Sequence, residues 1–326
     1  MRALLCTAFG PLEHLTVQEV PAPRPGPGQV LLDVKASSLN FPDALMVQGL
    51  YQVKPPLPFS PGAELAGVVV EAGDGLRGCV PGDRVIAIVG WGGFAEECVA
   101  DAGRLVPLPE GMDFETGAAF LFTYETALHA LRDSGRLAEG ETLLVLGAAG
   151  GVGLAAVEIG KAMGARVIAA ASSLEKLALC RERGADATID YAAENLRDRV
   201  RELTGGEGAD VVYDPVGGSC TEAALRATAW GGRLLVIGFA SGDIPKIPAN
   251  LALLKERAVV GVYWGESVKR DPEGHRRNVR QLLEWFGDCK VKPAISGRVP
   301  LEEAPAAMKR LVQRQVKGKI VILPEA

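Results

Sequence analysis

The sequence has few of the residues from which metal sites and disulfide frameworks are built. Its 326 residues include only three histidines and six cysteines, and no two cysteines form a C-x-x-C pair. The cysteines are Cys6, Cys79, Cys98, Cys180, Cys220 and Cys289. Such spacing excludes a zinc knuckle and gives no sign of a disulfide scaffold, so we expect reduced, buried thiols.

The sequence also lacks a charge block, a long apolar run and a low-complexity tract. Lys and Arg total 35 against 40 Asp and Glu, a net charge of −5, which argues against a nucleic-acid binder held by bulk charge. The apolar run at residues 4–9 breaks at Gly10 and is too short for a secretory signal, and no later run approaches a membrane span. We therefore expect a cytoplasmic protein of about two domains that binds neither nucleic acid nor membrane.

The first hundred residues contain short strand patterns separated by glycine and proline. The strand candidates are Val30–Lys35, Gly67–Glu71, Arg84–Ile88 and Phe94–Val99. They show no helical periodicity, and their spacing predicts a small barrel-like β unit. A helical pattern from Asp113 to Leu131 follows.

A strand–turn–helix pattern near the middle of the chain is typical of nucleotide binding. Leu143–Leu146 predicts a strand buried on both faces, and Gly153–Met163 predicts the helix after it. The turn follows the G-x-G-x-x-G pattern with alanine first: Ala148, Ala149, Gly150, Gly151, Val152 and Gly153. Such a turn brings backbone N–H groups and a helix N-terminus against a pyrophosphate. The alternative is a tight turn without a ligand, but the next strand, Arg166–Ala170, completes a βαβ unit and favours the nucleotide site.

The alternation of strands and helices continues beyond this unit. Further strands are predicted at Ala187–Ile189, Asp210–Tyr213, Arg233–Ile237 and Ala258–Tyr263, with helices at Ala192–Leu203 and Thr221–Ala229. Six such strands predict an α/β fold with a doubly wound parallel sheet. Two amphipathic helices, Arg276–Phe286 and Leu301–Arg314, and a closing strand, Lys319–Leu323, are expected to return to the first domain. The expected boundaries are residues 1–121, 122–263 and 264–326.

The residues that follow the second strand of the βαβ unit indicate the cofactor. An NAD-binding protein places Asp or Glu there, whereas this chain has Ala171, Ser172, Ser173 and Lys176. Hydroxyls and an ammonium bind a 2′-phosphate that a carboxylate would repel, so the sequence predicts NADPH over NADH. The alternative is that Ser172 caps the next helix and Lys176 is solvated on its first turn.

Several motifs together resemble the medium-chain dehydrogenase/reductase superfamily, and within it the zinc-free NADPH:quinone oxidoreductases of the zeta-crystallin branch. The motifs are Asn40–Asp43, Gly49–Tyr51, Pro61–Gly67, Ala148–Gly153 and Val212–Gly218. The resemblance covers essentially the whole chain. It implies a GroES-like β-barrel catalytic domain and a Rossmann domain that binds NADPH.

The branches of that superfamily differ in whether they bind zinc. In the stretch Pro61–Glu64, Ala63 stands where zinc alcohol dehydrogenases carry a ligand histidine. The histidines His14, His129 and His275 lie beside no cysteine or carboxylate pair with ligand spacing. We therefore expect no metal, and hydride transfer to an electron-poor acceptor such as a quinone.

The resemblance also implies the roles of individual residues. Asn40 and Tyr51 would donate to a substrate carbonyl oxygen, and Thr126 would lie beside the nicotinamide. Asn40 in a turn and Tyr51 in packing are the structural alternatives. Leu45 stands where some members carry a second tyrosine, which bears on the polarity of the pocket. The remaining implied cofactor contacts are Tyr191, Val216, Gly217, Gly238, Phe239, Ala240 and Trp264.

The sequence leaves two alternative functions open and also predicts an oligomeric state. An NADPH-dependent reductase of enones or enoyl-CoA thioesters would need a basic path, for which Lys269, Arg270, Arg276 and Arg277 are candidates, although such a run is more often a solvated face. A protein that binds NADPH without turnover is the other alternative. The apolar last strand, Val259–Tyr263, would leave an open sheet edge, and family members commonly join two sheets there, so we expect a homodimer.

Overall fold

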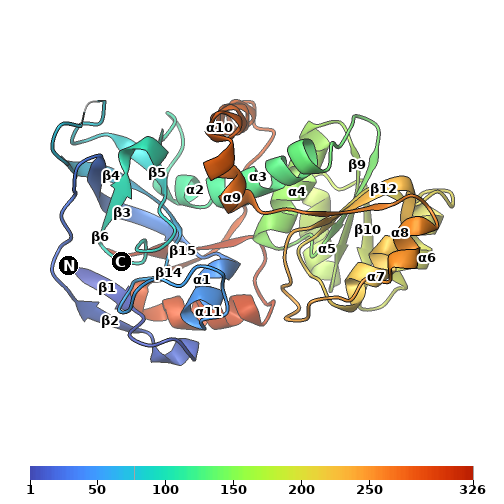
Figure 1. Ribbon diagram of the computed structural model, residues 1–326, viewed down its shortest axis with the longest axis horizontal. Coiled ribbons are helices and arrows are strands. Elements are labelled where there is room, and N and C mark those ends of the chain that lie inside the picture. Colours follow the sequence, from blue (N-terminus) through green and yellow to red (C-terminus); the bar gives the residue numbers. More distant parts are fainter. Residues whose placement is uncertain (77, 326) are drawn as a thin grey trace. The chain divides into compact units, whose positions relative to one another are not determined.

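The computed structural model describes residues 1–76 and 78–325 and divides into two compact units. Unit 1 comprises Met1–Phe122 and Pro293–Ala326, and unit 2 comprises Thr123–Lys292. The ribbon in Figure 1 shows that the blue N-terminal and red C-terminal segments share unit 1, whereas the middle of the chain forms unit 2.

Unit 1 is built mainly from β-strands. Its strands are β1 (Arg2–Leu5), β2 (Thr16–Glu19), β3 (Gln29–Ser38), β4 (Glu64–Ala72), β5 (Arg84–Ile88), β6 (Glu97–Asp101), β7 (Leu105–Pro107), β14 (Ile295–Pro300) and β15 (Lys319–Leu323). Its helical segments are η1 (Leu12–His14), α1 (Phe41–Val47), η2 (Ala102–Arg104), α2 (Phe114–Ala118), η4 (Leu301–Glu303) and α11 (Ala304–Val312). The order in the main sheet is β14-β15-β3-β4-β5-β7, and β6 also pairs with β3. The C-terminal strand β15 therefore lies beside β3 in unit 1, whereas the sequence led us to expect only that this strand returns to the first domain.

The central strand β3 is buried because it contributes to two cores. Val30, Leu32 and Val34 pack into one apolar cluster, and Ala36 packs into another that includes Val321 of β15. Small side chains at this second contact let the strands and α2 approach closely. The four predicted strands of this region are confirmed, with β6 beginning at Glu97 instead of Phe94.

Two helical features differ from the prediction, one in unit 1 and one where the chain passes from unit 1 to unit 2. The helix α1 was not expected, because seven residues give only about two turns and too short a window for periodicity. The expected continuous helix over Asp113–Leu131 is instead α2, then α3 (Leu121–Leu128), then a π-helical segment η3 (His129–Ser134). α2 ends at Ala118, because the backbone of its C-cap Ala119, with φ −101° and ψ 7°, departs from the helical conformation.

Unit 2 is a parallel sheet with the order β10-β9-β8-β11-β12-β13. Its strands are β8 (Thr142–Leu146), β9 (Arg166–Ala171), β10 (Ala187–Asp190), β11 (Ala209–Asp214), β12 (Thr228–Val236) and β13 (Ala258–Gly261). Its helices are α4 (Gly151–Ala162), α5 (Leu174–Glu182), α6 (Leu196–Leu203), α7 (Ser219–Arg226), α8 (Ala249–Leu253), α9 (Trp264–Arg270) and α10 (Pro272–Gly287). The predicted doubly wound sheet is confirmed.

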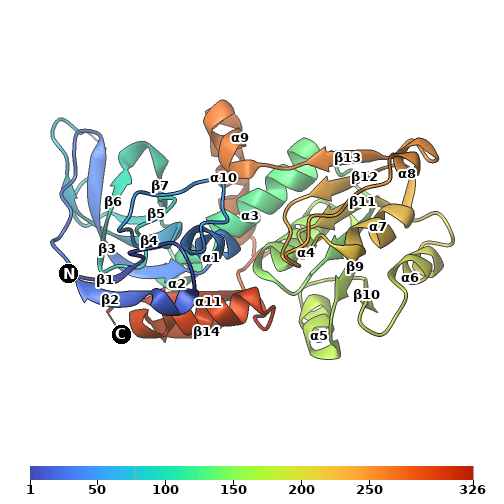
Figure 2. The same ribbon diagram turned by 60° about the horizontal axis from the view of Figure 1, so that its bottom comes forward.

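Helices cover both faces of this sheet (Figures 1 and 2). On one face, Leu144 and Leu146 of β8 cluster with Val200 of α6 and Ala224 of α7. On the other face α4 lies close to β8, since a Cβ at Gly160 would be 2.6 Å from Leu143 Cδ2. Alternate residues of a strand thus face opposite helices, which explains why β8 reads as a continuous apolar run.

The chain returns to unit 1 at Pro293, later than the predicted boundary at residue 264. The helix α10 stays with unit 2 because it is hydrogen-bonded to it. His275 Nδ1 lies 2.6 Å from Glu125 Oε1, and Asn278 Nδ2 donates to Asp133 Oδ2 at 3.0 Å. Polar side chains on an amphipathic helix gave no signal of these partners in the sequence.

No helix within residues 1–76 and 78–325 combines the length and apolar content needed to cross a membrane.

Candidate functional site

The turn after β8 has the geometry of a dinucleotide-binding loop. Gly147 has a φ of +56°, and the N–H of Gly150 donates to its carbonyl oxygen at 3.0 Å, which turns the chain into α4. A Cβ at Gly153 would collide with that same carbonyl oxygen, so only glycine lets α4 start this close to the turn. The first N–H groups of α4 have no helical acceptor and are suited to a phosphate.

This turn contains all of the predicted fingerprint residues. Ala148 and Ala149 are buried beside the strand, and the fingerprint glycines lead into α4. The sequence pattern placed Ala148 in the position of the first glycine, but the left-handed backbone conformation belongs to Gly147, one residue earlier. Gly147 was therefore missed, although a glycine directly after an apolar strand is the signal that would have found it.

The neighbouring strand-end loops lie at the topological switch point of the sheet. β8 lies between β9 and β11, so the chain winds in opposite directions on its two sides, and ligands of such sheets bind at this point. After β11, buried Asp214 accepts the N–H groups of Val216 and Gly217 through Oδ1, both at 2.9 Å, and the hydroxyl of Thr221 through Oδ2 at 2.6 Å. Asp214 therefore fixes the conformation of this loop, a role that was not predicted from the sequence.

The loop after β12 lies against the loop after β11. Ile237 N donates to Asp214 O at 2.9 Å, and Ala240 N donates to Pro215 O at 3.0 Å. A Cβ at Gly217 would lie 2.9 Å from Phe239 Cδ1, so the two loops come this close because Gly217 has no side chain. The structure thus brings together five predicted cofactor residues: Val216, Gly217, Gly238, Phe239 and Ala240.

The end of β9 carries the residues predicted to select the cofactor. Lys176 Nζ donates to Ser172 Oγ at 3.2 Å, and the backbone N–H of Tyr191 donates to Ala171 O at 3.1 Å. These four residues are therefore gathered at one end of β9 and β10. The helix cap is Ser173, whose Oγ accepts the Lys176 N–H at 3.3 Å, and not Ser172 as the structural alternative supposed.

One carboxylate lies near this group. Ala171 pairs in register with Asp190 of β10, and Asp190 Oδ1 accepts the N–H of Ala192 at 3.0 Å. The β9 strand itself ends in three alanines and contains no acidic residue.

Two further predicted residues of unit 2 lie on helices instead of strand-end loops. Thr126 is half-buried on α3, and Trp264 is buried as the first residue of α9, which follows the end of β13 at Gly261. Thr126 thus lies within the helix expected over Asp113–Leu131, whereas Trp264 was expected on a strand-end loop.

The two predicted substrate residues of unit 1 lie on either side of α1. Asn40 is the N-cap of α1 and is 4% exposed. Tyr51 follows α1, is partly buried and packs against the apolar core of unit 1. Leu45 lies within α1.

Asn40 belongs to a buried polar cluster that the sequence did not reveal. We use the name polar cluster for Ser38, Asn40, Asp43, Glu64 and Lys319. Lys319 Nζ donates to Asn40 Oδ1 at 2.6 Å and lies 3.7 Å from Glu64 Oε2. Ser38 Oγ donates to Glu64 Oε2 at 2.8 Å.

The remaining acceptors of the polar cluster hold the backbone around it. Glu64 Oε1 accepts the N–H of Phe122 at 2.8 Å. Asp43 accepts the N–H of Asn40 at 2.7 Å and that of Ala63 at 3.1 Å. The cluster thus ties together the start of α1, the start of β4, the start of α3 and β15.

Burial controls the charges of the polar cluster. It raises the pKa of Asp43 to about 7, against the N–H of Asn40 and the Lys319 ammonium, which both lower it. Burial likewise raises the pKa of Glu64, which Lys319 opposes, and lowers the pKa of Lys319, which Glu64 and Asp43 oppose. Two carboxyl groups share one buried cation, so charge balance favours one proton between them.

The stretch Pro61–Glu64, in which zinc alcohol dehydrogenases carry a ligand histidine, lies at the edge of the polar cluster. The methyl group of Ala63 offers no ligand atom, and its backbone N–H is taken by Asp43. Within the described residues, no group of three or more His, Cys, Asp or Glu side chains is arranged to hold a metal ion. His129 and His275 each face a single carboxylate, Asp133 at 3.1 Å and Glu125 at 2.6 Å.

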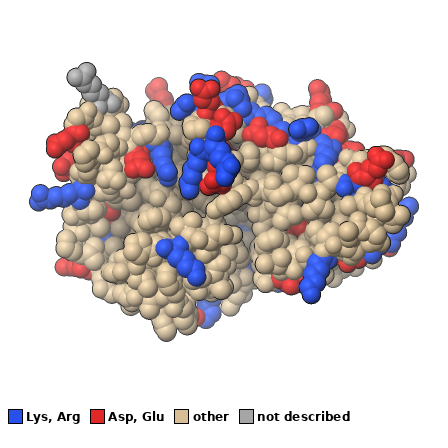
Figure 3. All heavy atoms as spheres, viewed as in Figure 1, with Lys and Arg blue, Asp and Glu red and all other residues tan. Residues whose placement is uncertain are grey.

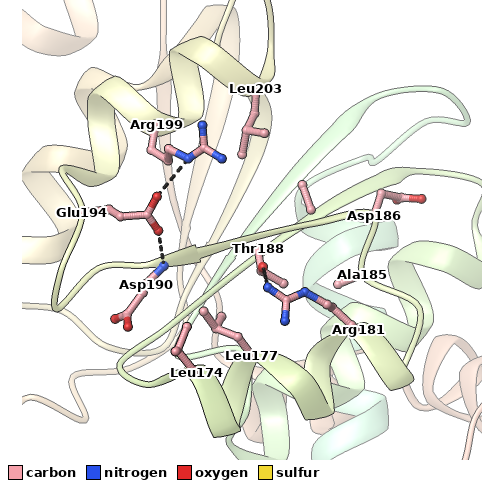
Figure 4. A pocket seen from close by; sticks show the side chains of 11 residues that line it. Leu174, Leu177, Arg181, Ala185, Asp186, Thr188, Asp190, Glu194, Arg199 and Leu203 are labelled. Carbon is pink, nitrogen blue, oxygen red and sulfur yellow. Dashed lines mark hydrogen bonds and ion pairs between the residues drawn. The ribbon is translucent and has the colours of Figure 1, made fainter.

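A surface hollow of unit 2 is separate from these loops. It has a volume of about 530 Å³ and lies between α5, β10 and α6 (Figure 4). Its two arginines already have partners: Arg181 donates to Thr188 Oγ1 at 2.6 Å, and Arg199 pairs with Glu194 at 2.9 Å. Since its lining includes no predicted cofactor residue, we do not assign it to the nucleotide.

The basic run considered for a coenzyme A path lies on α9 and α10. Lys269 and Arg270 both face Glu266, at 3.8 and 3.0 Å, so part of their charge is already balanced. The space-filling view in Figure 3 shows blue and red side chains interspersed over these helices. The run is therefore a mixed, solvated surface.

The strands, the glycine-rich turn and the switch-point loops define a dinucleotide-binding oxidoreductase fold. Residues 26–110 match the alcohol dehydrogenase GroES-like domain, and residues 151–286 match the family described as zinc-binding dehydrogenase. The chain is 42% identical over 325 residues to a quinone oxidoreductase-like protein 2 homolog of Nematostella vectensis, covering 98% of this chain and 88% of that protein. It belongs to the medium-chain dehydrogenase/reductase family, among the quinone oxidoreductase-like members.

Solved structures agree with this assignment. A mycobacterial protein complexed with NADPH superimposes with a TM-score of 0.93 at 32% identity, over 99% of this chain and 100% of that one. Escherichia coli quinone oxidoreductase complexed with NADPH superimposes with a TM-score of 0.93 at 28% identity, again over 99% and 100% of the two chains.

Proposed function

We propose that the protein transfers hydride from NADPH to a quinone without the help of zinc. The observation that carries the proposal is the end of β9, where Ser172, Ser173 and Lys176 lie together and no carboxylate ends the strand. The ammonium and hydroxyls suit a 2′-phosphate. The two solved relatives described as NADPH complexes support the same cofactor.

The residues of unit 2 fit a bound dinucleotide. The N-terminus of α4, which Gly153 lets start close to the turn, accepts the pyrophosphate, and the loops held by Asp214 line the switch point. A bound nicotinamide cofactor supplies the hydride, and Thr126 is the residue that we assign beside it.

On the acceptor side, Asn40 and Tyr51 donate hydrogen bonds. Negative charge develops on a carbonyl oxygen as hydride arrives at a conjugated acceptor, and an amide N–H or a phenol O–H stabilises it. No Lewis acid is needed for an acceptor that is already electron-poor. That the site works without zinc is part of the proposal, supported by the methyl group of Ala63 and by the absence of a ligand cluster among the described residues.

Reduction of enones is the second candidate, because it needs the same donors. The balanced charges at Lys269 and Arg270 give no particular support to a coenzyme A thioester. A screen of NADPH oxidation across quinones, enals and enoyl-CoA thioesters, with metal analysis of the same sample, tests the proposal. Turnover with quinones in a zinc-free sample is the expected result. Stoichiometric zinc would contradict the mechanism, and tight NADPH binding without turnover would identify a binding protein instead.

We further propose that two copies pair through β13 in a cytoplasmic homodimer. β13 forms one edge of the sheet, and Val259 on this strand is exposed. An open apolar edge offers unpaired backbone groups to a second strand.

A further inference from the structure

We propose that Lys319 is a positioning residue that fixes the side-chain amide of Asn40 with its N–H edge toward an incoming carbonyl oxygen. The inference rests on the proposed function, because it assigns how Asn40 recognises the acceptor. It follows from the direction of each hydrogen bond in the polar cluster.

The orientation of the Asn40 amide is decided by the chemistry of its neighbours. An ammonium group only donates, so the atom 2.6 Å from Lys319 Nζ must be the amide oxygen. The amide nitrogen then faces Ser38, donating to its carbonyl oxygen at 3.3 Å and to its Oγ at 3.4 Å. The oxygen of the amide is held tightly, whereas both contacts of the nitrogen to Ser38 are at the long end of the hydrogen-bond range. The Asn40 side chain also hydrogen-bonds the Glu64 carboxylate.

The polar cluster extends this arrangement into a chain of hydrogen bonds that runs in one direction, from the ammonium of Lys319 to the carboxylate of Glu64. Lys319 donates to Asn40, Asn40 donates to Ser38, and Ser38 donates to Glu64 at 2.8 Å. Glu64 faces Lys319 again at 3.7 Å and balances its charge. Flipping the amide would place an N–H group against the ammonium and a carbonyl oxygen against the carbonyl of Ser38. Two repulsive contacts would replace two attractive ones in a buried site, so only one orientation is stable.

This orientation defines the kind of substrate atom that Asn40 accepts. The charge-assisted bond from Lys319 polarises the amide and strengthens its N–H groups as donors. The long contacts to Ser38 are the ones that an incoming oxygen replaces at small cost. Asn40 is thus preset to donate to a carbonyl oxygen and is mismatched to a hydroxyl that needs an acceptor.

The decisive variant is Asn40→Asp. A carboxylate keeps an oxygen toward Lys319 but presents an acceptor where the amide presented a donor. We expect the thermal midpoint to fall, because a carboxylate oxygen then faces the carbonyl of Ser38, and the NADPH dissociation constant to stay close to that of the wild type. We expect kcat with a quinone to fall about 100-fold. Retention of kcat within about threefold would show that the N–H edge is not used and would overturn the inference.

Lys319→Met tests the positioning itself, with Lys309→Met as control. Lys309 is an exposed lysine whose ion pair with Glu13 at 2.8 Å lies outside the polar cluster. We expect kcat to fall by about tenfold or more in Lys319→Met, with partial rescue by Lys319→Arg, and no change in Lys309→Met. If Lys319→Met fails to fold, Lys319→Met/Glu64→Gln removes the ammonium together with the facing Glu64 carboxylate and carries the same expectation.

A readout without turnover separates this inference from the proposed function. If the wild type reduces no acceptor, the proposed function fails, but the side-chain ¹⁵N–¹H signals of Asn40 still report its hydrogen bonds. We expect these signals to move in Lys319→Met, while those of Asn278 in unit 2 stay in place. Unchanged Asn40 signals would show that Lys319 does not orient the amide.

Discussion

At the scale of single residues, the protein depends on groups whose charge and direction are set by their neighbours. Asn40 and Asp214 are both buried, and both hold their geometry through several directed hydrogen bonds instead of one. Lys176 differs from them, because Ser172, to which its Nζ donates, is exposed. Replacing Lys176 should therefore change the affinity for NADPH and leave the stability of the fold unchanged.

Replacing Lys176 with alanine should weaken NADPH selectively. A charge-assisted contact to the 2′-phosphate contributes on the order of 1.5–3 kcal/mol, so the KM for NADPH should rise at least about tenfold. The KM for NADH, which has no such phosphate, should barely change. Steady-state kinetics with both cofactors measure this, with Lys290→Ala as control, since exposed Lys290 pairs with Asp288 at 3.1 Å. Equal losses for both cofactors would remove Lys176 from the phosphate site.

The buried Asp43 should make the stability of the protein depend on pH. Burial raises the pKa of Asp43 from 3.8 to about 7 in the folded state, so the folded chain holds a proton that the unfolded chain releases. The stabilisation that this bound proton gives to the folded state is fully present below about pH 4 and is lost as pH rises through about 7. Asp43→Asn removes this titration.

Thermal midpoints of wild type and Asp43→Asn between pH 4 and pH 8 test that sign. We expect the variant to be less stable at low pH, because an amide oxygen can accept only one of the two backbone N–H groups without a new donor facing the other. The thermal midpoint of Asp43→Asn should fall less between pH 4 and pH 8 than that of the wild type. Parallel curves would mean that Asp43 does not titrate in this range.

At the scale of elements, the turn between β8 and α4 depends on glycine at one close approach. Gly153→Ala would push the start of α4 away from the Gly147 carbonyl, so we expect the NADPH dissociation constant to rise by at least about tenfold. Gly287→Ala is the matched control, since a Cβ there meets nothing within 4 Å. Fluorescence titration with NADPH measures both. Wild-type affinity in Gly153→Ala would contradict the assigned turn.

Elements with a strong local pattern were predictable from the sequence, and contacts between distant residues were not. β15 was predicted with its observed bounds, and the βαβ unit followed from apolar runs and glycines. The short helix α1 and the break between α2 and α3 were missed because neither leaves a long periodic signal. The polar cluster was missed because Asn40 and Lys319 lie 279 residues apart, and only the pairing of β15 with β3 brings them together.

At the scale of the whole molecule, the open edge of the unit 2 sheet should decide the assembly. Val259→Lys places a charge on the exposed face of β13, and edge lysines prevent strand pairing between chains. We expect the wild type to sediment as a dimer and the variant as a particle near the chain mass of 34.2 kDa. A wild type that sediments only at 34.2 kDa would rule out the proposed dimer.

The central claim concerns the reaction of the whole protein, and one measurement tests it most directly. NADPH carrying deuterium at the transferred position is mixed with a small para-quinone and chelator-treated protein, and NADPH loss and hydroquinone formation are followed together. The account predicts one hydroquinone for each NADPH consumed, with a primary isotope effect and no loss of rate after chelation. An absence of NADPH oxidation, or activity that disappears with the chelator and returns with zinc, would contradict it.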